Sequence, residues 1–436
     1  RYLVKNDGGT VQDLEALRPL LSKLMAEKKL LALYRELELP LLPVLAEMEL
    51  TGIAVDEKLL SDITKEFAKK IGELEETAYE QAGEPFNLKS PKQLGTILFD
   101  KLGLPVIKKT KTGYSTDVSV LEELEKHHPL LGTILQHRQL TKLYSTYLEG
   151  LKPLINKKTK RVHTHFQQTV TVTGRLSSTE PNLQNIPVRT EVGKRMRAMF
   201  VPGQGYDFLM SCDYSQVELR VLAHMAEDEL LLDSFGKGQD VHARTAAEVF
   251  EIPLKDVTPE MRTRAKAVNF GIVYGISDYG LGRQLGISRN EAAKYIESYF
   301  QRYTGVKDYM ERIVAEARKN GYVSTMFGRR RYLPDINNKN FNLRSFAERT
   351  AINTPIQGTA ADIIKLAMIR VHEALKAPGL KSRLLLQVHD ELVLEVCENE
   401  KERVGLLVKE IMENTVKLAV PLVADVAFGR NWAETK

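Results

Sequence analysis

The sequence has 436 residues, which is enough for two or three domains of ordinary size. Its composition, 43% hydrophobic, 27% charged and 7% aromatic, is typical of globular proteins and excludes a disordered polymer, a collagen-like fibre and a disulfide scaffold. The 62 Lys and Arg residues against 57 Asp and Glu residues give a net charge of +5, which permits a polyanionic partner without requiring one.

The two cysteines, Cys212 and Cys397, form neither a CxxC pair nor a metal-ligand spacing. They are typical of reduced thiols in an intracellular protein. No apolar run reaches the roughly 18 residues that a membrane-spanning helix needs. The chain opens at Arg1 without a basic-then-apolar leader, so we expect neither a membrane span nor a signal peptide.

The first third of the chain has the spacing of helices. Apolar residues recur every three or four positions over 37–77, with an interruption near Gly52. The Ser-Pro pair at 90–91 is the pattern of an N-cap followed by proline, and it predicts a helix over 92–102. A lysine-rich loop and a further helical run follow, at 108–113 and 118–151.

The charge balance shifts sharply between residues 152 and 197. This segment contains ten basic residues and only two acidic residues, Glu180 and Glu191. The ten are Lys152, Lys157, Lys158, Lys160, Arg161, Arg175, Arg189, Lys194, Arg195 and Arg197. Small hydrogen-bonding residues are interleaved with them, and 162–173 alternates like a strand. The pattern favours phosphate and sugar contacts of a nucleic acid, with a solvated basic face as the alternative.

The rest of the chain mixes helices with short apolar strands. Residues 208–212 form an apolar run suited to a buried strand, which ends at Asp213 and passes into a helix. The later predicted elements are a helical block over 228–340, strands over 384–388 and 392–396, a helix over about 400–418 and a strand over 422–428. Helical blocks that flank two small β regions predict the α+β class.

Acidic residues lie at the ends of two distant strands. Asp213 ends the first strand, and Asp390 and Glu391 lie at the tip of the later hairpin. If both strands belong to one sheet, these carboxylates can converge and hold two divalent ions about 3.5–4 Å apart. Oxygen ligands with substrate phosphates suit Mg²⁺. The alternative for either site alone is an acid that is merely solvated at a turn.

One predicted helix carries cations and aromatic rings on the same face. Arg262, Lys266, Phe270 and Tyr274 recur every four residues, so each is rotated only about 40° from the one before. Cations along a triphosphate and a ring for base stacking would both come from this face. An amphipathic helix with core aromatics and solvated cations is the alternative that the spacing itself favours.

A polar trio follows the same spacing further along the chain. Arg349, Asn353 and Gln357 can read minor-groove acceptors of a duplex. Pro355 lies among them, so we predict a kink or break near Thr354 in place of one straight helix.

Other chemistries lack their motifs. No GxxxxGK[ST] loop is present, which argues against a P-loop ATPase, and the glycines at 280–286 miss the GxGxxG spacing without a preceding strand. His163 and His165 lie in the alternating run and are interpreted as structural residues.

Five segments, taken together, resemble the motifs of the family A (polymerase I type) DNA polymerases, in the family's order and spacing. They are 173–178 (Thr-Gly-Arg-Leu-Ser-Ser), 181–187 (Pro-Asn-Leu-Gln-Asn-Ile-Pro), 213–220 (Asp-Tyr-Ser-Gln-Val-Glu-Leu-Arg, similar to motif A), Arg262, Lys266, Phe270 and Tyr274-Gly275 (similar to motif B), and 387–391 (Gln-Val-His-Asp-Glu, similar to motif C). The resemblance runs from about Leu37 to Lys436 and is closest in kind to bacterial large fragments without an exonuclease domain.

The resemblance implies a right-handed α+β architecture with a helical thumb, an antiparallel-sheet palm and helical fingers. The expected divisions are 1–35 as the remnant of an N-terminal exonuclease-like domain, 36–155 as thumb, 156–227 as the first part of the palm, 228–345 as fingers and 346–436 as the second part of the palm. With so few residues before the thumb, the chain is expected not to proofread.

The resemblance also implies roles for single residues. The implied catalytic residues are Asp213, Asp390, Glu391 and Lys266, the last as proton donor to pyrophosphate. The implied metal ligands are Asp213, the Tyr214 carbonyl and Asp390. The implied dNTP-binding residues are Arg262, Lys266, Phe270, Tyr274, His242, Glu218 and Gln216, with Glu218 excluding a ribose 2′ hydroxyl. The implied DNA-binding residues are Arg175, Asn182, Gln184, Asn185, Arg349, Asn353, Gln357 and His389.

The implied activity is template-directed addition of dNTPs to a primer 3′ end by two-metal-ion phosphoryl transfer. Its cofactor would be two Mg²⁺ ions, with Mn²⁺ able to substitute, and its partners primer-template DNA and dNTPs. A cytoplasmic monomer, associated with the nucleoid if bacterial, is the expected form. Two alternatives stay open: a single-subunit RNA polymerase, against which Glu218 and the 173–178 segment argue, and a DNA-binding relative without catalysis, against which Asp213, Lys266 and Asp390 argue.

Overall fold

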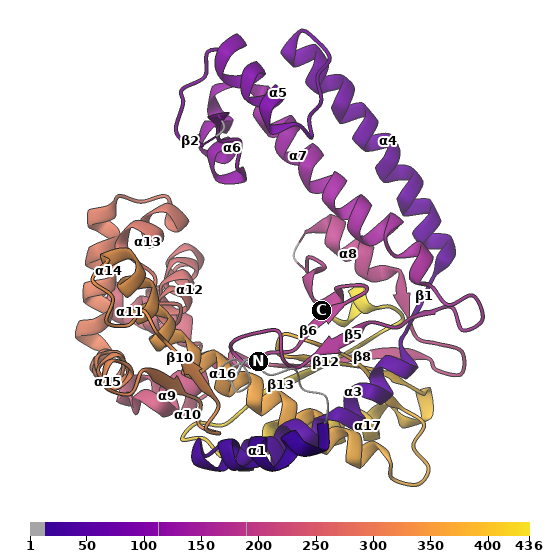
Figure 1. Cartoon of the computed structure of the whole chain (residues 1–436), viewed down its shortest axis with the longest axis vertical. Helices are drawn as coiled ribbons and strands as arrows, with labels where there is room; N and C mark the ends of the chain where they lie inside the picture. Colours follow the sequence, from indigo (N-terminus) through magenta and orange to yellow (C-terminus); the bar gives the residue numbers. More distant parts are fainter. Residues whose placement is uncertain (1–13, 112, 189) are drawn as a thin grey trace.

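The computed structural model describes residues 14–111, 113–188 and 190–436. Thr112 of the lysine-rich loop, Arg189 of the basic segment and the first 13 residues of the predicted remnant lie outside the described residues. The description begins with helix α1 (Leu14–Glu27), which runs along the base of the molecule in Figure 1.

A four-stranded antiparallel sheet lies at the centre of the molecule. Its strand order is β11 (Arg383–Val388), β12 (Glu391–Val396), β8 (Phe208–Tyr214) and β13 (Ala424–Gly429). The predicted strand that ends at Asp213 and the predicted hairpin therefore join one sheet, because β8 lies between β12 and β13. Residues Phe208–Cys212 of the central strand β8 are all buried, which explains the unbroken hydrophobic run in the sequence.

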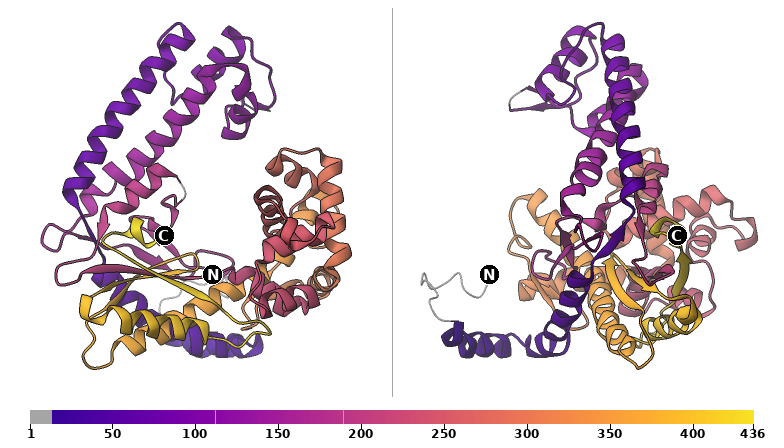
Figure 2. Two further views of the ribbon diagram at one scale, coloured as in Figure 1. Left: turned by 180° about the vertical axis from the view of Figure 1, so that it is seen from behind. Right: turned by 90° about the vertical axis from the view of Figure 1, so that its right-hand side faces the viewer.

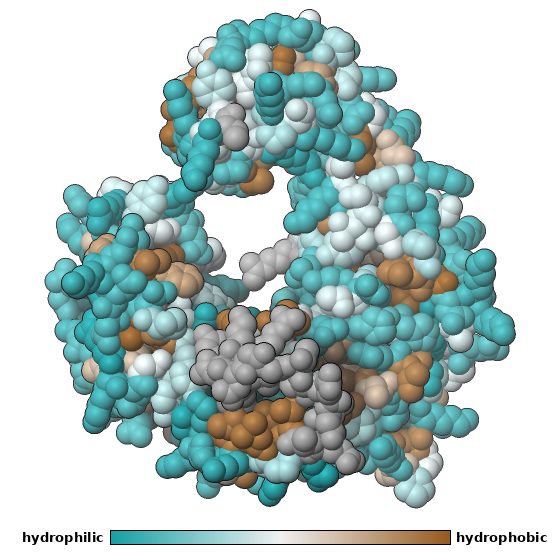
Figure 3. All heavy atoms as spheres, viewed as in Figure 1, coloured by the Kyte–Doolittle hydropathy of each residue, from teal (hydrophilic) through white to brown (hydrophobic). Residues whose placement is uncertain are grey.

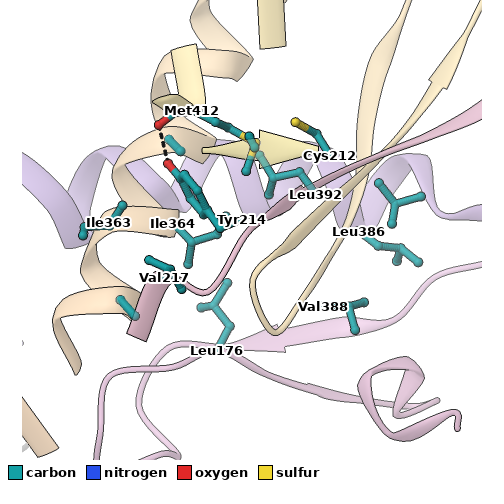
Figure 4. Packing of buried hydrophobic residues seen from close by; sticks show 14 of the residues in the cluster. Leu176, Cys212, Tyr214, Val217, Ile363, Ile364, Leu386, Val388, Leu392 and Met412 are labelled. Atoms are coloured by element: carbon teal, nitrogen blue, oxygen red, sulfur yellow. Dashed lines mark hydrogen bonds between the residues drawn. The ribbon is translucent and has the colours of Figure 1, made fainter. Parts of the chain in front are cut away.

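Long helices cover one face of this sheet. Figure 2 (left) shows α16 (Phe341–Leu375) and α17 (Lys401–Glu413) beneath the strands, and α3 (Leu39–Thr51) packs against α16 and β11. In Figure 4 the ring of Tyr214 enters this core, and its hydroxyl donates to the Met412 carbonyl oxygen at 2.7 Å.

Of the kink or break predicted near Thr354, the break is wrong, because α16 continues through Pro355 as one helix of 35 residues. A kink at this point stays a prediction. Burial explains this outcome: Pro355 and the two turns that follow it pack into the core. Tertiary packing supplies more free energy here than the proline removes by deleting one hydrogen bond.

A helical arm projects from the sheet. Its two long helices, α4 (Glu57–Ala82) and α7 (Pro129–Leu143), lie side by side, and its tip has a hydrophobic cluster of its own that includes Phe86 and Leu98. The shorter helical elements of the arm are α5 (Pro91–Gly95), η2 (Thr96–Lys101), α6 (Val118–Leu124) and η4 (Tyr144–Glu149). Ser90 caps α5 as predicted, by accepting from the Gln93 amide.

The interruption predicted near Gly52 is a short strand at the base of the arm. Strand β1 (Ile53–Val55) pairs with β4 (Arg161–Val162) and β7 (Phe200–Val201). Gly52 has φ of 62°, and a Cβ atom there would collide with the Val162 carbonyl oxygen. Glycine is therefore needed to turn the chain between the helix and the strand.

A second helical block faces the arm across the sheet. It comprises α9 (Val217–Ala226), α10 (Glu229–Gly236), α11 (Val241–Phe250), α12 (Pro259–Val273), α13 (Asp278–Leu285), α14 (Arg289–Arg302) and α15 (Thr304–Asn320). The helical prediction for 228–340 missed one hairpin, β9 (Tyr322–Ser324) with β10 (Arg330–Tyr332). Both strands are too short to show an alternating pattern.

The arm, the block and the sheet surround an open passage. Figure 3 shows that the passage stays open when every side chain is drawn, and that hydrophilic residues border most of it. The α+β prediction is confirmed, and both cysteines are buried free thiols. Among the described helices none is both long enough and apolar enough to span a membrane.

A buried ion pair ties the arm's base to the central sheet. The Arg161 guanidinium donates to both Glu395 carboxylate oxygens, at 2.9 and 2.8 Å, and Glu395 is fully buried. We predict that Arg161→Met lowers the free energy of unfolding by about 2 kcal/mol, because it leaves a buried carboxylate undercompensated.

The neighbouring Lys160 provides the control, since its ion pair with Glu57 is exposed. Lys160→Met should change stability by less than about 0.5 kcal/mol. Urea unfolding followed by circular dichroism measures both, and equal effects of the two substitutions would contradict the prediction.

Candidate active site

The central sheet brings the predicted carboxylates together. Asp213 on β8 lies directly opposite Glu391 on β12 in the strand register. The Tyr214 amide donates to the Asp390 carbonyl oxygen at 3.1 Å, so the hairpin tip is bonded to the end of β8. Residues that face each other on neighbouring strands have Cβ atoms about 4.5–5.5 Å apart. The convergence expected from the sequence is thus present in the backbone.

Glu391 and Asp213 share a cation. The Lys436 ammonium lies 2.7 Å from Asp213 Oδ2 and 3.0 Å from Glu391 Oε2. The other Glu391 oxygen accepts from Ser211 Oγ at 2.6 Å and from Trp432 Nε1 at 3.3 Å. Glu391 is therefore fixed on three sides, whereas Asp213 is half-buried and opens toward the passage.

The electrostatics of the cluster follow from burial among like charges. Burial, with the nearby Glu218 and Asp213 carboxylates, raises the pKa of Asp390 to about 7. Burial also raises the pKa of Asp213, although Lys436 opposes the shift. Burial would lower the pKa of Lys436, but the Glu391 and Asp213 carboxylates outweigh it and hold that pKa above its ordinary value. A further cation would relieve this concentration of negative charge.

Glu218 lines the cavity, and two hydrogen bonds hold its carboxylate in place. Arg175 Nη2 donates to Glu218 Oε1 at 2.5 Å, and the Tyr274 hydroxyl donates to Oε2 at 3.1 Å. The side chain is buried, which raises its pKa. Gln216, two residues earlier, starts α9 with a left-handed backbone, φ 54°. The carboxylate is therefore held rigidly beside the acids of the sheet.

The aromatic half of the face predicted around α12 reaches the cavity, whereas the two cations of that face are not among the cavity's lining residues. Phe270 and Tyr274 line the same cavity as Asp213 and Asp390. The Arg262 guanidinium is paired with Asp240 at 2.6 Å. Lys266, one turn further along, is half-buried, and no ion pair joins it to a carboxylate within the described part of the chain.

His242 behaves as a neutral group in this structure. It is buried, and burial lowers its pKa to about 4. The Asn269 side-chain amide donates to His242 Nδ1 at 3.0 Å, which places the ring proton on Nε2. Its ring centroid lies 5.6 Å from that of Phe270. The residue can therefore donate one hydrogen bond but carries no positive charge.

One cavity of about 650 Å³ lies among the acids of the sheet, Glu218 and the two aromatic side chains. It is lined by Arg175, Val188, Arg197, Asp213, Tyr214, Gln216, Val217, Glu218, Phe270, Tyr274, Val388, His389, Asp390, Glu391 and Lys436. A volume of this size suits a nucleotide-sized ligand.

The expected DNA-binding residues fall into two groups. Several already serve the fold: Asn182 Oδ1 accepts from the Gln184 amide, Gln184 donates to the Gln387 carbonyl oxygen at 3.1 Å, and Asn353 donates to the Val273 carbonyl oxygen at 3.3 Å. The remainder are exposed or half-buried: Arg175, Asn185, Arg349, Gln357 and His389. Of these, Arg175 and His389 line the cavity. Arg349 also packs under Gly275, where a Cβ atom would lie 3.0 Å from its Cγ.

A buried charge network that the sequence reasoning missed supports the Arg175 loop. Arg329 bonds Asp362 at 2.8 Å and also pairs with Glu38, and Lys365 donates to Glu38 at 2.8 Å. Gly174 lies against Arg329, where any Cβ atom would collide with it. Asp362 and Lys365 stand in an otherwise apolar stretch of α16, and that was the available signal. Arg197 and Lys436 were also missed as members of the cavity.

The oxygen donors fit divalent cations of the magnesium type. Asp213, Asp390 and Glu391 offer hard carboxylate oxygens, and Lys436 shows that a cation fits between two of them. No group of three or more His, Cys, Asp or Glu side chains is ready to hold a metal within 14–111, 113–188 and 190–436. A metal at this place would therefore depend partly on ligand oxygens from a substrate.

Comparison with known proteins decides the family. The model described as DNA polymerase family A matches residues 57–434. The chain belongs to this family. The family's right-hand α+β architecture accordingly describes the fold: the sheet belongs to the palm, the arm to the thumb and helices α10–α15 of the block to the fingers. Family A polymerases generally depend on divalent metal ions.

Similar proteins include several bacterial polymerases. DNA polymerase I of Bacillus caldotenax is 57% identical over 402 residues, covering 92% of this chain and 46% of the relative. DNA polymerase I of Bacillus subtilis (strain 168) is 53% identical over 423 residues, covering 97% and 48%. The chain thus spans about half the length of these relatives. The solved POL domain of Pol1 from M. smegmatis, in complex with DNA primer-template and dNTP, has 49% identity and a TM-score of 0.92, covering 97% of this chain and 74% of that one.

The raised pKa of Asp390 predicts a pH dependence of stability. In the unfolded chain its pKa returns to about 3.8, so the native state binds the proton more tightly. The resulting stabilisation is present below about pH 4 and is lost as the pH rises through about 7. We predict that Asp390→Asn reduces this loss and is more stable than the parent by about 1 kcal/mol or more at about pH 8 without divalent cations.

Urea midpoints measured from about pH 5 to about pH 8 in EDTA test the prediction. Asp425→Asn is the matched control, because this residue lies in the same sheet on β13. A parent and an Asp390→Asn variant with parallel pH profiles would contradict it.

Proposed function

We propose that this chain is a DNA-directed DNA polymerase, which adds dNTPs to a primer 3′ end and releases pyrophosphate. The observation that carries the proposal is the register of β8 against β12, which sets Asp213 beside Asp390 and Glu391 on the floor of a nucleotide-sized cavity. Membership of family A and the primer-template and dNTP complex of the M. smegmatis domain support it.

The acids of the palm would hold two Mg²⁺ ions, or Mn²⁺ in their place. We propose Asp213, Asp390 and the Tyr214 carbonyl as the ligands, with Glu391 assisting from the adjacent strand position. When bound, two such ions would lower the pKa of the primer 3′ hydroxyl and neutralise the phosphates. In-line attack of the 3′ oxygen on the α-phosphorus would form one O–P bond and break the bond to pyrophosphate, while the hydroxyl proton passes to solvent.

The fingers helix α12 would position the triphosphate. Arg262 and Lys266 lie one turn apart on the face that also carries Phe270. Lys266, which has no carboxylate partner among the described residues, is the proposed donor of a proton to the leaving pyrophosphate. His242 would contribute a neutral Nε2–H hydrogen bond. Gln216 would contact the nucleotide beside the palm acids.

Three side chains would recognise the sugar and base. Phe270 and Tyr274 offer ring surfaces to the cavity, and Glu218 lies between Tyr274 and Arg175. A buried carboxylate fixed by two donors cannot move aside for a 2′ hydroxyl, so the geometry favours deoxyribose. This rigidity supports DNA synthesis over the RNA polymerase alternative.

Primer-template DNA would occupy the passage between thumb and fingers. The proposed DNA contacts are Arg175, Arg349 and Gln357, together with Asn182, Gln184, Asn185, Asn353 and His389. We also propose that the thumb comprises 36–155, the palm 156–227 and 346–436, and the fingers 228–345. The protein would act as a cytoplasmic monomer on chromosomal DNA, and its DNA affinity would fall steeply with salt.

Primer extension on a DNA template with Mg²⁺ tests the reaction. The parent should extend with dNTPs, and Asp390→Ala should lose at least about 1,000-fold in rate, because charge neutralisation supplies much of the catalysis. Asp425→Ala, in the same sheet, should keep the rate within a few-fold. A DNA-binding parent without extension would instead support the relative without catalysis.

Sugar selection tests the Glu218 wall separately. Glu218→Ala removes the buried carboxylate, so the preference for dNTPs over rNTPs in kcat/KM should fall by at least about 100-fold, which is about 2.7 kcal/mol. The comparison variant is Tyr274→Phe, which deletes one of the two hydrogen bonds to Glu218 and should lower the preference less. Efficient rNTP extension by the parent would favour an RNA polymerase.

A further inference from the structure

Lys436 occupies the position between the two palm carboxylates. Its ammonium bridges Asp213 and Glu391 at 2.7 and 3.0 Å, and only 27% of its side chain is exposed. Both carboxylates belong to the cluster that would hold divalent cations. One residue of the chain therefore satisfies the charge that a metal ion would otherwise satisfy.

The backbone that carries Lys436 continues from an anchored segment. The short helix η9 (Trp432–Thr435) precedes it, and Asn431 caps this helix by accepting from the Ala433 amide at 3.0 Å. Trp432 is fully buried and lies edge-on to Phe200. Its indole nitrogen also donates to Glu391, so the same segment that delivers the ammonium grips one of the carboxylates.

Arg197 is a second cation of the cavity, and it is more deeply buried and more firmly packed than Lys436. The Arg197 guanidinium is 1% exposed, stacks over the Trp432 ring at 4.0 Å and donates to the Ile186 carbonyl oxygen. Its Nε and Nη1 groups have no hydrogen-bond partner among the described residues. Packing on all sides keeps Arg197 in place, whereas a lysine has a flexible four-carbon stem that can carry its charge away.

We propose that Lys436 is an exchangeable counter-ion of the polymerase site. It neutralises Asp213 and Glu391 when no divalent cation is bound, and it withdraws when one binds. The inference rests on the proposed function, since it takes these carboxylates as metal ligands. Lys436 is thus a positioning residue that lowers metal affinity in the free protein and makes full occupancy depend on the phosphates that a nucleotide brings.

Manganese binding to the free protein tests this directly. The dissociation constant of Mn²⁺ is measured by electron paramagnetic resonance without DNA or nucleotide, so the readout does not depend on activity. Lys436→Met should bind Mn²⁺ about ten-fold more tightly, equivalent to about 1.4 kcal/mol, because the competing charge is gone. Lys436→Arg should stay close to the parent, and Lys101→Met, which removes an exposed lysine paired with Glu84 on the thumb, should not change.

Thermal unfolding gives a second measurement that also detects misfolding. In EDTA, Lys436→Met should unfold at a lower temperature than the parent, because its carboxylates are unneutralised, and Mn²⁺ should restore it to the parent value. Equal or weaker Mn²⁺ binding by Lys436→Met, in a variant that still extends primers, would overturn this inference alone. Mn²⁺ binding that is insensitive to Asp213→Asn would overturn the metal assignment of the proposed function, and this inference with it.

Discussion

The pairing of β8 with β12 is the constraint on which the site depends. Side chains alternate between the two faces of a strand, so a slip of one residue would turn Asp213 into the helical core and bring Cys212 to the cavity. The register is secured by apolar residues on the covered face, among them Cys212 and Leu392, which lie opposite each other above α16 and α17. The hydrophobic core therefore positions the carboxylates of Asp213 and Glu391 at the cavity.

The charged side chains of the cavity differ in how freely they can move. Arg197 and Arg175 are held by packing and hydrogen bonds, so they supply a constant positive field. The Lys436 ammonium pairs with the two acids that it neutralises, at the end of a flexible side chain. Glu218 completes the arrangement as a buried anion that must be balanced by Arg175 and Tyr274. In the proposed polymerase, the same few contacts would set metal affinity, sugar fit and the ionisation of Asp390.

The sequence could predict what depends on local pattern. Apolar runs that end in acids located β8 and the β11–β12 hairpin, and four-residue spacing located the face of α12. It could not predict that α16 continues through Pro355, because tertiary burial outweighs the local cost of proline. Nor could spacing find Lys436 or the Glu38–Arg329 pair, since these contacts join residues hundreds of positions apart. The neutral state of His242 likewise depends on burial and on Asn269.

The thumb's tip has a core that is separate from the core of the palm. Phe86, Leu98, Leu121 and Ile134 pack with one another, and the long helices α4 and α7 connect this cluster to the rest of the molecule. Because the two clusters of buried residues have no member in common within the described ranges, each can tolerate sequence change independently. The tip is therefore a suitable site for exchanging modules: another small domain grafted onto α4 and α7 would replace this separate core and leave the core of the palm intact.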